Sequence, residues 1–488
     1  MIRFLLNQTP VAEADLDPNT TLLTYLRRIR GRHGTKEGCA SGDCGACTVV
    51  LAQAAAGKLQ YRSVNACITL VSALHGKQLL TVEDLQQQGQ LHGIQRAMVD
   101  CHASQCGFCT PGIIMSLFAL QKSAADTRAD ASNNDEAITQ ALGGNLCRCT
   151  GYRSIVAAAR QSCQDRSGDC FAARETETLT QLARLDPPPF ADPGKFDGKG
   201  PACLIPRTLT QLSDAYRRHP AARLLAGGTD LALAITLRRE SLPLLIDISH
   251  LPELKTLAAD ERQLTIGAGA SLSACEPFLA QYLPGFADVL PRFASRQIRN
   301  QATLGGNLAN ASPVGDGAPM LLALDARLRL RQGEEVRELP LDLFFHAYRA
   351  TALRPGEFIE QIIIPRVTAS HIYHAYKVSK RREDDISAVF GAFNCEVRQG
   401  IIQSARLAYG GMAAIPLRAA GAEAALTGRP WGAEAFEHAC LALAADFSPL
   451  SDLRASAHYR LRVAQNLLRR FYLASALPSE RLEVGHYA

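Results

Sequence analysis

Residues 37–49, EGCASGDCGACTV, constrain the fold more than any other stretch, because three cysteines, three glycines and two alanines share thirteen positions. Cys39, Cys44 and Cys47 follow the spacing C-x4-C-x2-C. A buried core needs bulky side chains, and this stretch has almost none, so these are not a run of ordinary core cysteines. A disulfide knot, a zinc site or an iron–sulfur cluster would explain the crowding.

The rest of the sequence bears on the choice between disulfides and metal. The N-terminus, MIRFLLNQTP, has only a three-residue apolar burst after one arginine, whereas a secretory signal needs about 7–15 apolar residues. No stretch reaches the roughly 18 apolar residues of a membrane span. We therefore expect a cytoplasmic protein with no membrane partner, in which thiols stay reduced. Fifteen cysteines in that compartment indicate metal binding.

Length and charge limit the architecture and the partners. At 488 residues the chain is too long for one core, and we expect roughly three or four domains. The net charge of +5 is mild for this length, and no basic run is interleaved with aromatic residues. Nucleic-acid binding therefore has little support.

A fourth cysteine, Cys67, extends the first set to C-x4-C-x2-C-x19-C. This is the spacing of plant-type [2Fe–2S] proteins, in which four thiolates hold one cluster. Gly38, Gly42 and Gly45 permit positive φ angles and let backbone N–H groups face the cluster sulfurs. The predicted ligands are therefore Cys39, Cys44, Cys47 and Cys67.

A second cysteine set lies in SQCGFCTPG and GGNLCRCTGY, with Cys106 and Cys109 spaced C-x2-C and Cys147 and Cys149 spaced C-x-C. Each pair precedes a predicted helix, whose first N–H groups and positive dipole end favour an anionic cluster. The spacing favours a second [2Fe–2S] cluster. A four-cysteine zinc site is the alternative, since zinc sites also use C-x2-C pairs.

The other seven cysteines lack ligand spacing and are expected to be small buried or surface residues. Cys101 is the one closest to a cysteine motif. The histidines form no H-x3-H or H-E-x-x-H pair, so a hydrolytic metal site has no support, and His102 is expected to be a packing residue. The seven are Cys101, Cys163, Cys170, Cys203, Cys275, Cys395 and Cys440.

Local patterns divide the chain into an α+β multidomain protein. Strand and turn signals over 1–80 predict a small α+β unit, in which TLLTYLRRIRG (21–31) is one amphipathic helix with Ile29 on its apolar face. Four helical stretches fill 81–163. The run DPPPFADPGKFDGKG marks 164–200 as a linker. Mixed α/β patterns cover 201–370, and strands followed by helices cover 371–488.

Two glycine loops in the mixed α/β region are candidate phosphate cradles. In LAGGTD, after a predicted strand that ends at Leu225, Gly227 and Gly228 let backbone N–H groups approach an anion. Most such turns bind nothing, and this one is not the G-x-G-x-x-G fingerprint. A second loop of the same character, TLGGNLANASPVGD, makes a phosphate-binding role the favoured interpretation.

Several of these motifs together resemble the xanthine dehydrogenase/aldehyde oxidase family of molybdenum hydroxylases. GCASGDCGACTV, CHASQCGFCTPGIIMS and GGNLCRCTGYR resemble its iron–sulfur half. LLAGGTDL (224–231) and RQIRNQATLGGNLANASPVGDGAPML (296–321) resemble its FAD-binding domain, and KVSKRREDDI (377–386) resembles the xanthine dehydrogenase branch.

The resemblance implies the fold of each segment. A β-grasp, plant-type ferredoxin-like domain would occupy 1–80, and a helical-bundle [2Fe–2S] domain would occupy 81–163. An FAD-binding domain of the vanillyl-alcohol-oxidase/PCMH type would span 201–370. The last segment, 371–488, would be an α+β domain like that of the CO dehydrogenase flavoprotein.

The resemblance also implies the roles of individual residues. Phe293 would lie against the flavin ring and Ile359 near the adenine, while Lys377 would reach the polar edge of the flavin. Asp384 would lie near the flavin face and Tyr348 near an NAD site. The two phosphate cradles would be formed by Leu225, Ala226, Gly227, Gly228, Thr229 and Asp230, and by Thr303, Gly306, Asn307 and Asp316.

A molybdenum-cofactor domain follows in single-chain members, and its absence here implies the small subunit of a split enzyme. The partner chain, in an expected heterotetramer, would carry the molybdopterin, with Gln105 and the Cys147–Cys149 loop facing it. Electrons from purine oxidation would pass through the second cysteine set, then the first, to FAD and NAD+. An aldehyde or N-heterocycle hydroxylase is an alternative, and an electron carrier serving several partners is another.

Overall fold

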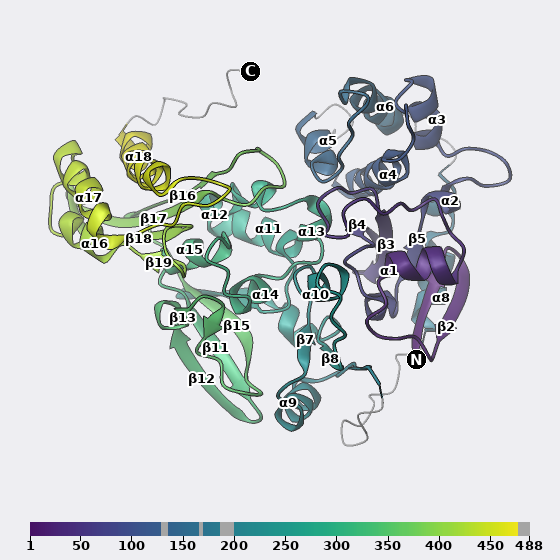
Figure 1. Ribbon diagram of the computed structural model, residues 1–488, viewed down its shortest axis with the longest axis horizontal. Helices are drawn as coiled ribbons and strands as arrows, with labels where there is room; N and C mark the ends of the chain where they lie inside the picture. Colours follow the sequence, from purple (N-terminus) through teal and green to yellow (C-terminus); the bar gives the residue numbers. More distant parts are fainter. Residues whose placement is uncertain (128–134, 165–168, 186–199, 477–488) are drawn as a thin grey trace. The chain divides into compact units, whose positions relative to one another are not determined.

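The protein is described by a computed structural model over residues 1–127, 135–164, 169–185 and 200–476. Contacts between residues divide the chain into two units (Figure 1). Unit 1 comprises Met1–His250 and Ala294–Ala302, and unit 2 comprises Leu251–Phe293 and Thr303–Ala488. The predicted segment 201–370 is therefore shared between the two units.

Unit 1 begins with a five-stranded sheet in the order β2-β1-β5-β3-β4. The β1–β5 pair is parallel and the other pairs are antiparallel. One face packs on Leu22, Leu23, Tyr25 and Leu26 to form a core that also holds Cys47 and Cys67. The strands are β1 (Ile2–Leu6), β2 (Thr9–Glu13), β3 (Thr48–Ala55), β4 (Lys58–Asn65) and β5 (Gln78–Leu80), and a 3-10 turn, η2, spans Val71–Leu74.

The helix predicted over 21–31 is interrupted. Only α1 (Leu22–Thr24) is α-helical, and it continues as a π-helical turn, η1 (Tyr25–Ile29). The amide of Arg30 bonds to the carbonyl of Tyr25, five residues back. This wider turn rotates the following side chains, and Ile29, predicted on the apolar face, is 49% exposed.

Four longer helices, with short α2, form the bundle predicted for 81–163 (Figure 1). Phe118 of α4 is fully buried and meets the rings of Tyr61, His92 and Phe171 edge-on. These contacts join the bundle to β4 and to the segment that follows the bundle. The helices are α2 (Val82–Leu85), α3 (Gly93–Asp100), α4 (Thr110–Thr127), α5 (Asp135–Leu142) and α6 (Arg153–Gln164).

Part of the predicted linker 164–200 is helical, as α7 (Cys170–Ala173) and α8 (Glu175–Ala183). Leu182 of α8 packs against Leu5 and Leu59 of the first sheet, so this stretch buries apolar surface that its sequence did not reveal. Most of the Pro-rich run that suggested the linker, 186–199, lies outside the described residues.

Unit 1 ends with a parallel sheet in the order β6-β8-β7. Its strands are β6 (Ala202–Leu204), β7 (Arg223–Leu225) and β8 (Leu244–Asp247). The helices α9 (Leu209–Arg218) and α10 (Ala232–Thr236) follow β6 and β7, and α13 (Arg296–Arg299) joins this unit from farther along the chain.

Unit 2 contains an antiparallel sheet in the order β12-β11-β15-β10-β9. Helix α14 contacts β15, and its Gly305 approaches the backbone of Ala268 too closely for any side chain. The strands are β9 (Leu257–Ala259), β10 (Gln263–Gly267), β11 (Arg327–Gln332), β12 (Glu335–Pro340) and β15 (Phe358–Pro365), with a β13 (Phe345–Ala347) and β14 (Ala350–Thr351) hairpin. The helices are η4 (Pro252–Lys255), α11 (Leu272–Tyr282), α12 (Pro284–Ala287), η5 (Leu290–Arg292), α14 (Leu304–Ala309), α15 (Gly317–Leu322) and η6 (Leu341–Leu343).

The last part of unit 2 is an antiparallel sheet, β16-β17-β18-β19, covered by three helices (Figure 1). Phe393, Tyr409, Phe436 and Phe471 fill the space between them. The elements are β16 (His371–Val378), β17 (Val389–Arg398), β18 (Ile401–Gly410), β19 (Leu417–Arg418), α16 (Ala420–Leu426), α17 (Ala433–Asp446) and α18 (Ala457–Ala476). The predicted α+β multidomain class is confirmed, and none of the helices described is both long and apolar enough to cross a membrane.

Candidate functional site

The four cysteines of the first set meet at one end of the N-terminal sheet. Three lie in the loop before β3, and Cys67 follows β4. The Cys39 thiol contacts those of Cys44 and Cys67, and the Cys67 thiol also contacts Cys47. Cys47 and Cys67 are buried, whereas Cys39 and Cys44 are partly exposed.

The backbone around this set is shaped by glycine and donates to sulfur. The amides of Ser41 and Cys67 donate to the Cys39 and Cys47 Sγ atoms, each over 3.4 Å. Gly42 and Gly45 have positive φ angles, +87° and +67°. Gly38 does not use the positive φ that glycine permits. A Cβ there would lie 2.7 Å from the Cys44 Sγ, so this glycine is needed for close approach.

In the first set, the pKa values of Cys39, Cys44 and Cys67 depend on the contacts among these thiols. Hydrogen bonds from Cys44 and Cys67 lower the pKa of Cys39, and the same contacts raise the pKa of Cys44 and of Cys67. Burial raises the pKa of the last two further. Cys44 and Cys67 therefore resist ionisation beside Cys39 unless a cation binds them, so the donor set fits a cluster that is held by thiolates.

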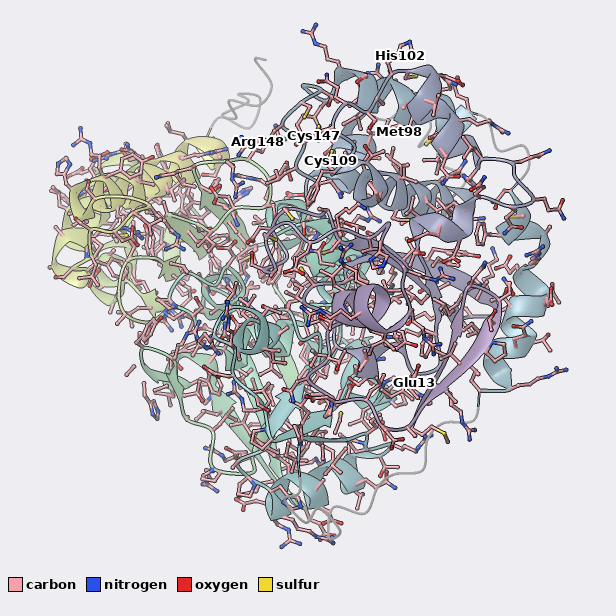
Figure 2. The ribbon with its side chains drawn as sticks, turned by 45° about the vertical axis from the view of Figure 1, so that its right-hand side comes forward. Glu13, Met98, His102, Cys109, Cys147 and Arg148 are labelled. Carbon is pink, nitrogen blue, oxygen red and sulfur yellow. The ribbon has the colours of Figure 1, made fainter. Side chains whose placement is uncertain are left out.

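The second set also brings its thiols together, in two pairs. The Cys109 thiol contacts that of Cys147, and the Cys106 thiol contacts that of Cys149; Cys109 and Cys147 are labelled in Figure 2. The first cysteine pair immediately precedes α4, and the second lies shortly before α6, as the sequence predicted. Cys106 and Cys149 are exposed.

Local hydrogen bonds prepare Cys147 to ionise. Burial alone would raise its pKa, but hydrogen bonds from the Thr150 hydroxyl and from the amides of Thr150 and Cys149 lower the pKa to about 7. Its own amide donates to the Tyr152 hydroxyl over 2.7 Å. For Cys109, burial and then the contact with Cys147 raise the pKa to about 12.

The described residues contain no group of three or more His, Cys, Asp or Glu side chains placed to hold a single metal ion. In the second set the thiols are linked pairwise. A two-iron cluster takes its four ligands as one pair on each iron, which is the arrangement that these contacts resemble.

The two cysteine loops are bonded directly to each other. The Leu146 amide donates to the Cys44 carbonyl over 2.9 Å, and the Asn145 side chain donates to the Gly45 carbonyl over 3.1 Å. A Cβ on Gly45 would lie 2.1 Å from the Gly144 carbonyl oxygen. The role of Asn145 was missed from the sequence, although its position between a glycine pair and a cysteine pair was a signal.

The first predicted phosphate cradle, 225–230, belongs to unit 1. Leu225 ends β7, so the turn leaves the carboxyl end of a parallel strand, where such sheets bind ligands. Gly228 has a φ of +73°. A Cβ on Gly227 would lie 2.0 Å from the Gln301 carbonyl oxygen, so this glycine is needed for packing against residues 301–302. Ala226 and Thr229 are half-buried and Asp230 is exposed.

The second predicted cradle lies in unit 2, where Thr303, Gly306, Asn307 and Asp316 come together around α14 and the start of α15. The Thr303 hydroxyl accepts from the Gly306 amide over 3.0 Å. The Asn307 Oδ1 is buried with no donor among the described residues, and a Cβ on Gly317 would lie 2.5 Å from it. A buried acceptor without a donor is what a bound group with N–H or O–H donors would satisfy, so these residues fit a flavin cofactor.

Lys377 joins this second cradle through an ion pair. Its Nζ lies 2.7 Å from the Asp316 Oδ2, with both side chains at most 6% exposed. The other oxygen, Oδ1, accepts from the Ser387 hydroxyl over 2.6 Å. The Arg292 Nη1 donates to the Lys377 carbonyl over 3.0 Å. This bond places the segment that ends at Phe293 beside β16, the strand that carries Lys377.

The remaining predicted cofactor residues are spread over unit 2. Phe293 and Ile359 are buried, at 9% and 6% exposure, the latter on β15, which contacts α14. Asp384 is half-buried with a φ of +47°. Tyr348, on the β13–β14 turn, is 63% exposed.

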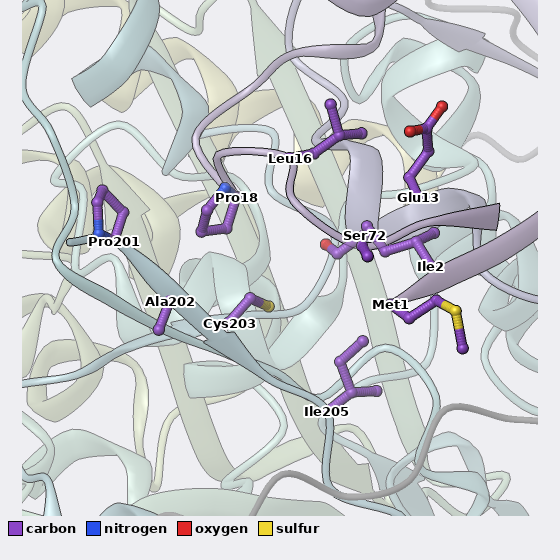
Figure 3. Close-up of a pocket in the computed structure, with 11 residues that line it drawn as sticks. Met1, Ile2, Glu13, Leu16, Pro18, Ser72, Pro201, Ala202, Cys203 and Ile205 are labelled. Atoms are coloured by element: carbon purple, nitrogen blue, oxygen red, sulfur yellow. The ribbon is translucent and has the colours of Figure 1, made fainter. Parts of the chain in front are cut away.

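Other singled-out residues lie apart from these clusters. His102 is exposed with a φ of +50°, so its expected packing role is wrong. The Cys101 thiol donates to the Gln161 Oε1 over 3.2 Å. A pocket of about 200 Å³ in unit 1 is lined by Met1, Glu13, Ser72 and Cys203, among others (Figure 3), and includes none of the predicted site residues.

Four sequence families match the chain in succession. The first is described as a 2Fe-2S iron-sulfur cluster binding domain and matches residues 6–72, and the second is a [2Fe-2S] binding domain over 81–160. The third is the FAD binding domain in molybdopterin dehydrogenase, over 195–367. The fourth, over 374–475, is the CO dehydrogenase flavoprotein C-terminal domain.

Curated relatives are similar along nearly the whole chain. The xanthine dehydrogenase of Emericella nidulans is 36% identical over 528 residues, covering 96% of this chain and 38% of that protein. The xanthine dehydrogenase/oxidase of Mus musculus is 31% identical, with the same two coverages. Aldehyde oxidase 2 of Cavia porcellus is 32% identical, covering 96% of this chain and 39% of that protein. The chain thus spans about two fifths of the length of these relatives.

Solved structures are similar over part of the chain. A carbon monoxide dehydrogenase chain of Hydrogenophaga pseudoflava matches with a TM-score of 0.53 and 28% identity, covering 56% of this chain and 95% of that chain. A chain of quinoline 2-oxidoreductase from Pseudomonas putida 86 matches with a TM-score of 0.53 and 25% identity, covering 57% and 98%.

Proposed function

Because the chain belongs to the molybdenum hydroxylase family and carries its iron–sulfur and flavin domains, we propose that it is the electron-transfer subunit of a xanthine dehydrogenase. A separate subunit with a molybdenum cofactor would oxidise hypoxanthine and xanthine to urate. This chain would deliver the resulting electrons to NAD+, within a cytoplasmic heterotetramer.

The convergence of eight cysteine thiols into two bonded loops carries this proposal. When bound, the two [2Fe–2S] clusters supply one-electron steps and FAD supplies the exchange of an electron pair with a nicotinamide. The chain's own contribution at the clusters is to hold the thiolates and to donate amide hydrogens to sulfur. Such donors stabilise negative charge at the cluster.

In unit 2 the flavin would contact the cluster around Asn307 and Asp316. We assign the predicted cradle of unit 1, Leu225–Asp230, to cofactor binding as well. Asp316 fixes the Lys377 ammonium group in a buried position. A fixed cation beside a flavin stabilises added negative charge, because little solvent is present to screen it. We assign Phe293 and Ile359 to packing on the cofactor, and Asp384 and Tyr348 to the NAD+ side.

The exposed side of the second cysteine set is the proposed contact for the molybdenum subunit. Cys106 and Cys149 are exposed, as is Gln105. Phe108 is 47% exposed and Leu146 is 36% exposed. Aromatic and aliphatic side chains exposed beside a redox centre are suited to a protein interface that brings a second centre close.

Xanthine is favoured as substrate on two grounds. The first ground is the 36% identity to the Emericella nidulans xanthine dehydrogenase, although the mouse xanthine dehydrogenase/oxidase at 31% and the guinea-pig aldehyde oxidase 2 at 32% are equally similar to the chain. The segment KRREDD resembles the xanthine dehydrogenase branch. The similarity to quinoline 2-oxidoreductase, which covers 98% of that chain, supports an N-heterocycle hydroxylase as the second candidate. A general electron carrier is a third.

Copurification with the partner tests the proposal. The chain would be tagged and isolated from its native cells, and its iron, acid-labile sulfide, FAD and molybdenum contents measured. We expect four irons and one FAD per chain, a stoichiometric molybdenum-containing subunit, and NADH formation that depends on xanthine. Activity with quinoline or an aldehyde instead of xanthine would favour the second candidate. Full cluster and flavin content without a molybdenum subunit would favour the carrier, and zinc or disulfides in place of iron would refute all three.

A further inference from the structure

Four polar side chains that carry no predicted function are almost completely buried between the two cysteine loops. Thr48, Ser116, Asn145 and Gln297 are each at most 2% exposed. Thr48 begins β3, Ser116 lies on α4, Asn145 precedes the second cysteine pair, and Gln297 lies on α13. Buried polar groups are costly unless every donor and acceptor is satisfied, so the bonds among these four need explanation.

Asn145 is bonded to the loop of the first cysteine set. Its Nδ2 donates to the Gly45 carbonyl over 3.1 Å and to the Thr48 Oγ1 over 3.2 Å. The Thr48 hydroxyl donates to the same carbonyl over 2.7 Å. Both hydrogens of the Asn145 side-chain amide therefore donate to Gly45 and Thr48, which lie on either side of Cys47 in the sequence.

Gln297 completes the network from the other side. Its Nε2 donates to the Asn145 Oδ1 over 2.8 Å and to the Ser116 Oγ over 3.1 Å. The Ser116 hydroxyl donates to the Asn145 Oδ1 over 2.7 Å. The Gln297 Nε2 also lies 3.5 Å from the Thr48 Oγ1, so its two hydrogens face three acceptors, while the Asn145 Oδ1 receives two donors.

The direction of every bond follows from one backbone group. The Gly45 carbonyl can only accept, so Asn145 must turn its Nδ2 toward it and its Oδ1 toward Gln297. Gln297 must then present its Nε2. Its Oε1 is left buried without a donor among the described residues, and a Cβ on Gly144 would lie 2.5 Å from it.

The network is tied to the cysteine ligands by very short stretches of chain. Gly45 lies next to Cys44, Thr48 follows Cys47, and Asn145 is two residues before Cys147. A shift of the network therefore moves both cysteine loops. Gln297 is supplied by a segment 152 residues farther along the chain than Asn145, and this segment continues directly into the second predicted flavin cradle.

We propose that Gln297 is a positioning residue that fixes the separation and orientation of the two cysteine loops, and hence of the two clusters. This inference rests on the proposed function, which places a cluster in each loop. The electron-transfer step between two centres depends steeply on their separation, so a side chain that locks both loops controls that step without touching a cluster.

The test compares variants of the complete protein, purified with its partner subunit. Gln297→Met keeps the length of the side chain and removes its donors, and Gln297→Glu places a carboxylate oxygen against the Asn145 Oδ1. Gln121→Met is the matched control, because Gln121 is also buried, at 4% exposure on α4, and among the described residues its Nε2 donates to the Ser162 carbonyl, outside the network. Iron and flavin contents, amide hydrogen exchange, and the paramagnetic spectrum of the reduced clusters are measured for each.

We expect the Gln297 variants to accelerate exchange in peptides covering both 44–48 and 144–149 by roughly tenfold, the factor for one buried group that loses its partner. The magnetic interaction between the two reduced clusters should change, and Gln121→Met should change neither. If Gln297→Met does not fold, Ser116→Ala removes one member of the network and should give the same pattern more weakly. Unaltered exchange and an unaltered cluster interaction, with or without lower stability, would overturn the proposal.

The iron content of the unaltered protein separates this inference from the proposed function. A protein that binds no iron would refute the proposed function, and with it the assignment of clusters to the loops. A protein with both clusters, whose Gln297 variants behave like Gln121→Met, would retain the proposed function and refute the positioning role.

Discussion

The backbone amide of Leu146 donates to the carbonyl oxygen of Cys44 over 2.9 Å, one of the hydrogen bonds that join the two cysteine loops. Leu146 directly precedes Cys147. Cys44 and Cys147, candidate ligands of different clusters, are therefore connected through one hydrogen bond and the single residue Leu146. The side chain of Leu146 remains 36% exposed. One residue therefore supplies both a link between the loops and part of the proposed partner contact.

Replacing Gly45 with alanine should disturb both cysteine sets. The new Cβ would lie 2.1 Å from the Gly144 carbonyl oxygen and 2.6 Å from the Asn145 Nδ2, at a φ of +67°. We expect loss of iron and sulfide from both clusters, with destabilisation of at least about 2 kcal/mol from overpacking and backbone strain together. Metal analysis and thermal unfolding measure this.

Gly57→Ala is the control for this substitution. Gly57 has a similar φ of +76°, but nothing lies within 4 Å of the position of its Cβ. In Gly57→Ala, backbone strain at the positive φ should lower the free energy of unfolding by about 1 kcal/mol and leave the iron content unchanged. Equal iron loss in both variants would show that close packing at Gly45 is unimportant.

Serine substitutions should separate the two clusters spectroscopically. Cys44→Ser removes a thiol of the first set and Cys147→Ser one of the second, so each should abolish or shift one of two signals in the paramagnetic spectrum of the reduced protein. Cys101→Ser, next to the second motif, should leave both signals unchanged, because its thiol bonds to Gln161. A Cys101 effect equal to that of Cys147 would mean that the ligand set is misassigned.

The sequence contained much of the local structure. Cysteine spacing predicted the local parts of both thiol groups, because Cys39, Cys44 and Cys47 share one loop and each pair of the second set lies within one short stretch. The helices that follow the two cysteine pairs, α4 and α6, were also expected from the sequence. The assignments of the cluster ligands and of the flavin residues stay predictions, as do the domain boundaries.

Features that depend on distant contacts could not be predicted. The π-helical turn at Tyr25 leaves no distinct spacing of apolar residues in the sequence. The burial of Leu182 against Leu5 could not be predicted either, because the sequence around Leu182 resembled a linker. Gln297 and Asn145 are 152 residues apart, and neither has a spacing signature. Lys377 was predicted to reach a flavin, but its ion pair with Asp316 appears only when strand β16 meets the start of helix α15 in the folded chain.

Removing the Lys377 ammonium group should destabilise unit 2 and weaken flavin binding. In Lys377→Met the buried Asp316 keeps only its bond from Ser387, and breaking a buried ion pair costs roughly 3–5 kcal/mol. Urea unfolding and FAD content measure the effect. The double variant Lys377→Met, Asp316→Asn should recover part of the stability, because no buried charge is left alone.

The control for this ion pair is Lys380→Met, three residues along the same segment. Lys380 is exposed, and its Nζ donates to the Leu453 carbonyl, so its loss should change stability by less than about 0.5 kcal/mol. A flavin content that is unchanged in Lys377→Met would count against the assignment of this lysine to the cofactor.

Unit 1 should lose stability between pH 6.5 and about 4 because of His75. Burial, then the charges of His250, Arg207 and the N-terminal amine, lower the pKa of His75 to about 4, with Asp247 opposing them, and its Nδ1 accepts from the Arg3 amide over 3.1 Å. In the unfolded chain His75 binds a proton near pH 6.5, whereas in the folded chain it binds one only near pH 4. The free energy of unfolding therefore decreases as the pH drops between these values, by at most about 3 kcal/mol. His75→Gln retains an acceptor but does not titrate, so hydrogen exchange of peptides from β1 and β5, compared with the parent at each pH, should reveal a weaker dependence. The exposed His438→Gln should match the parent, and a His75→Gln profile that also matches it would exclude this histidine as the source.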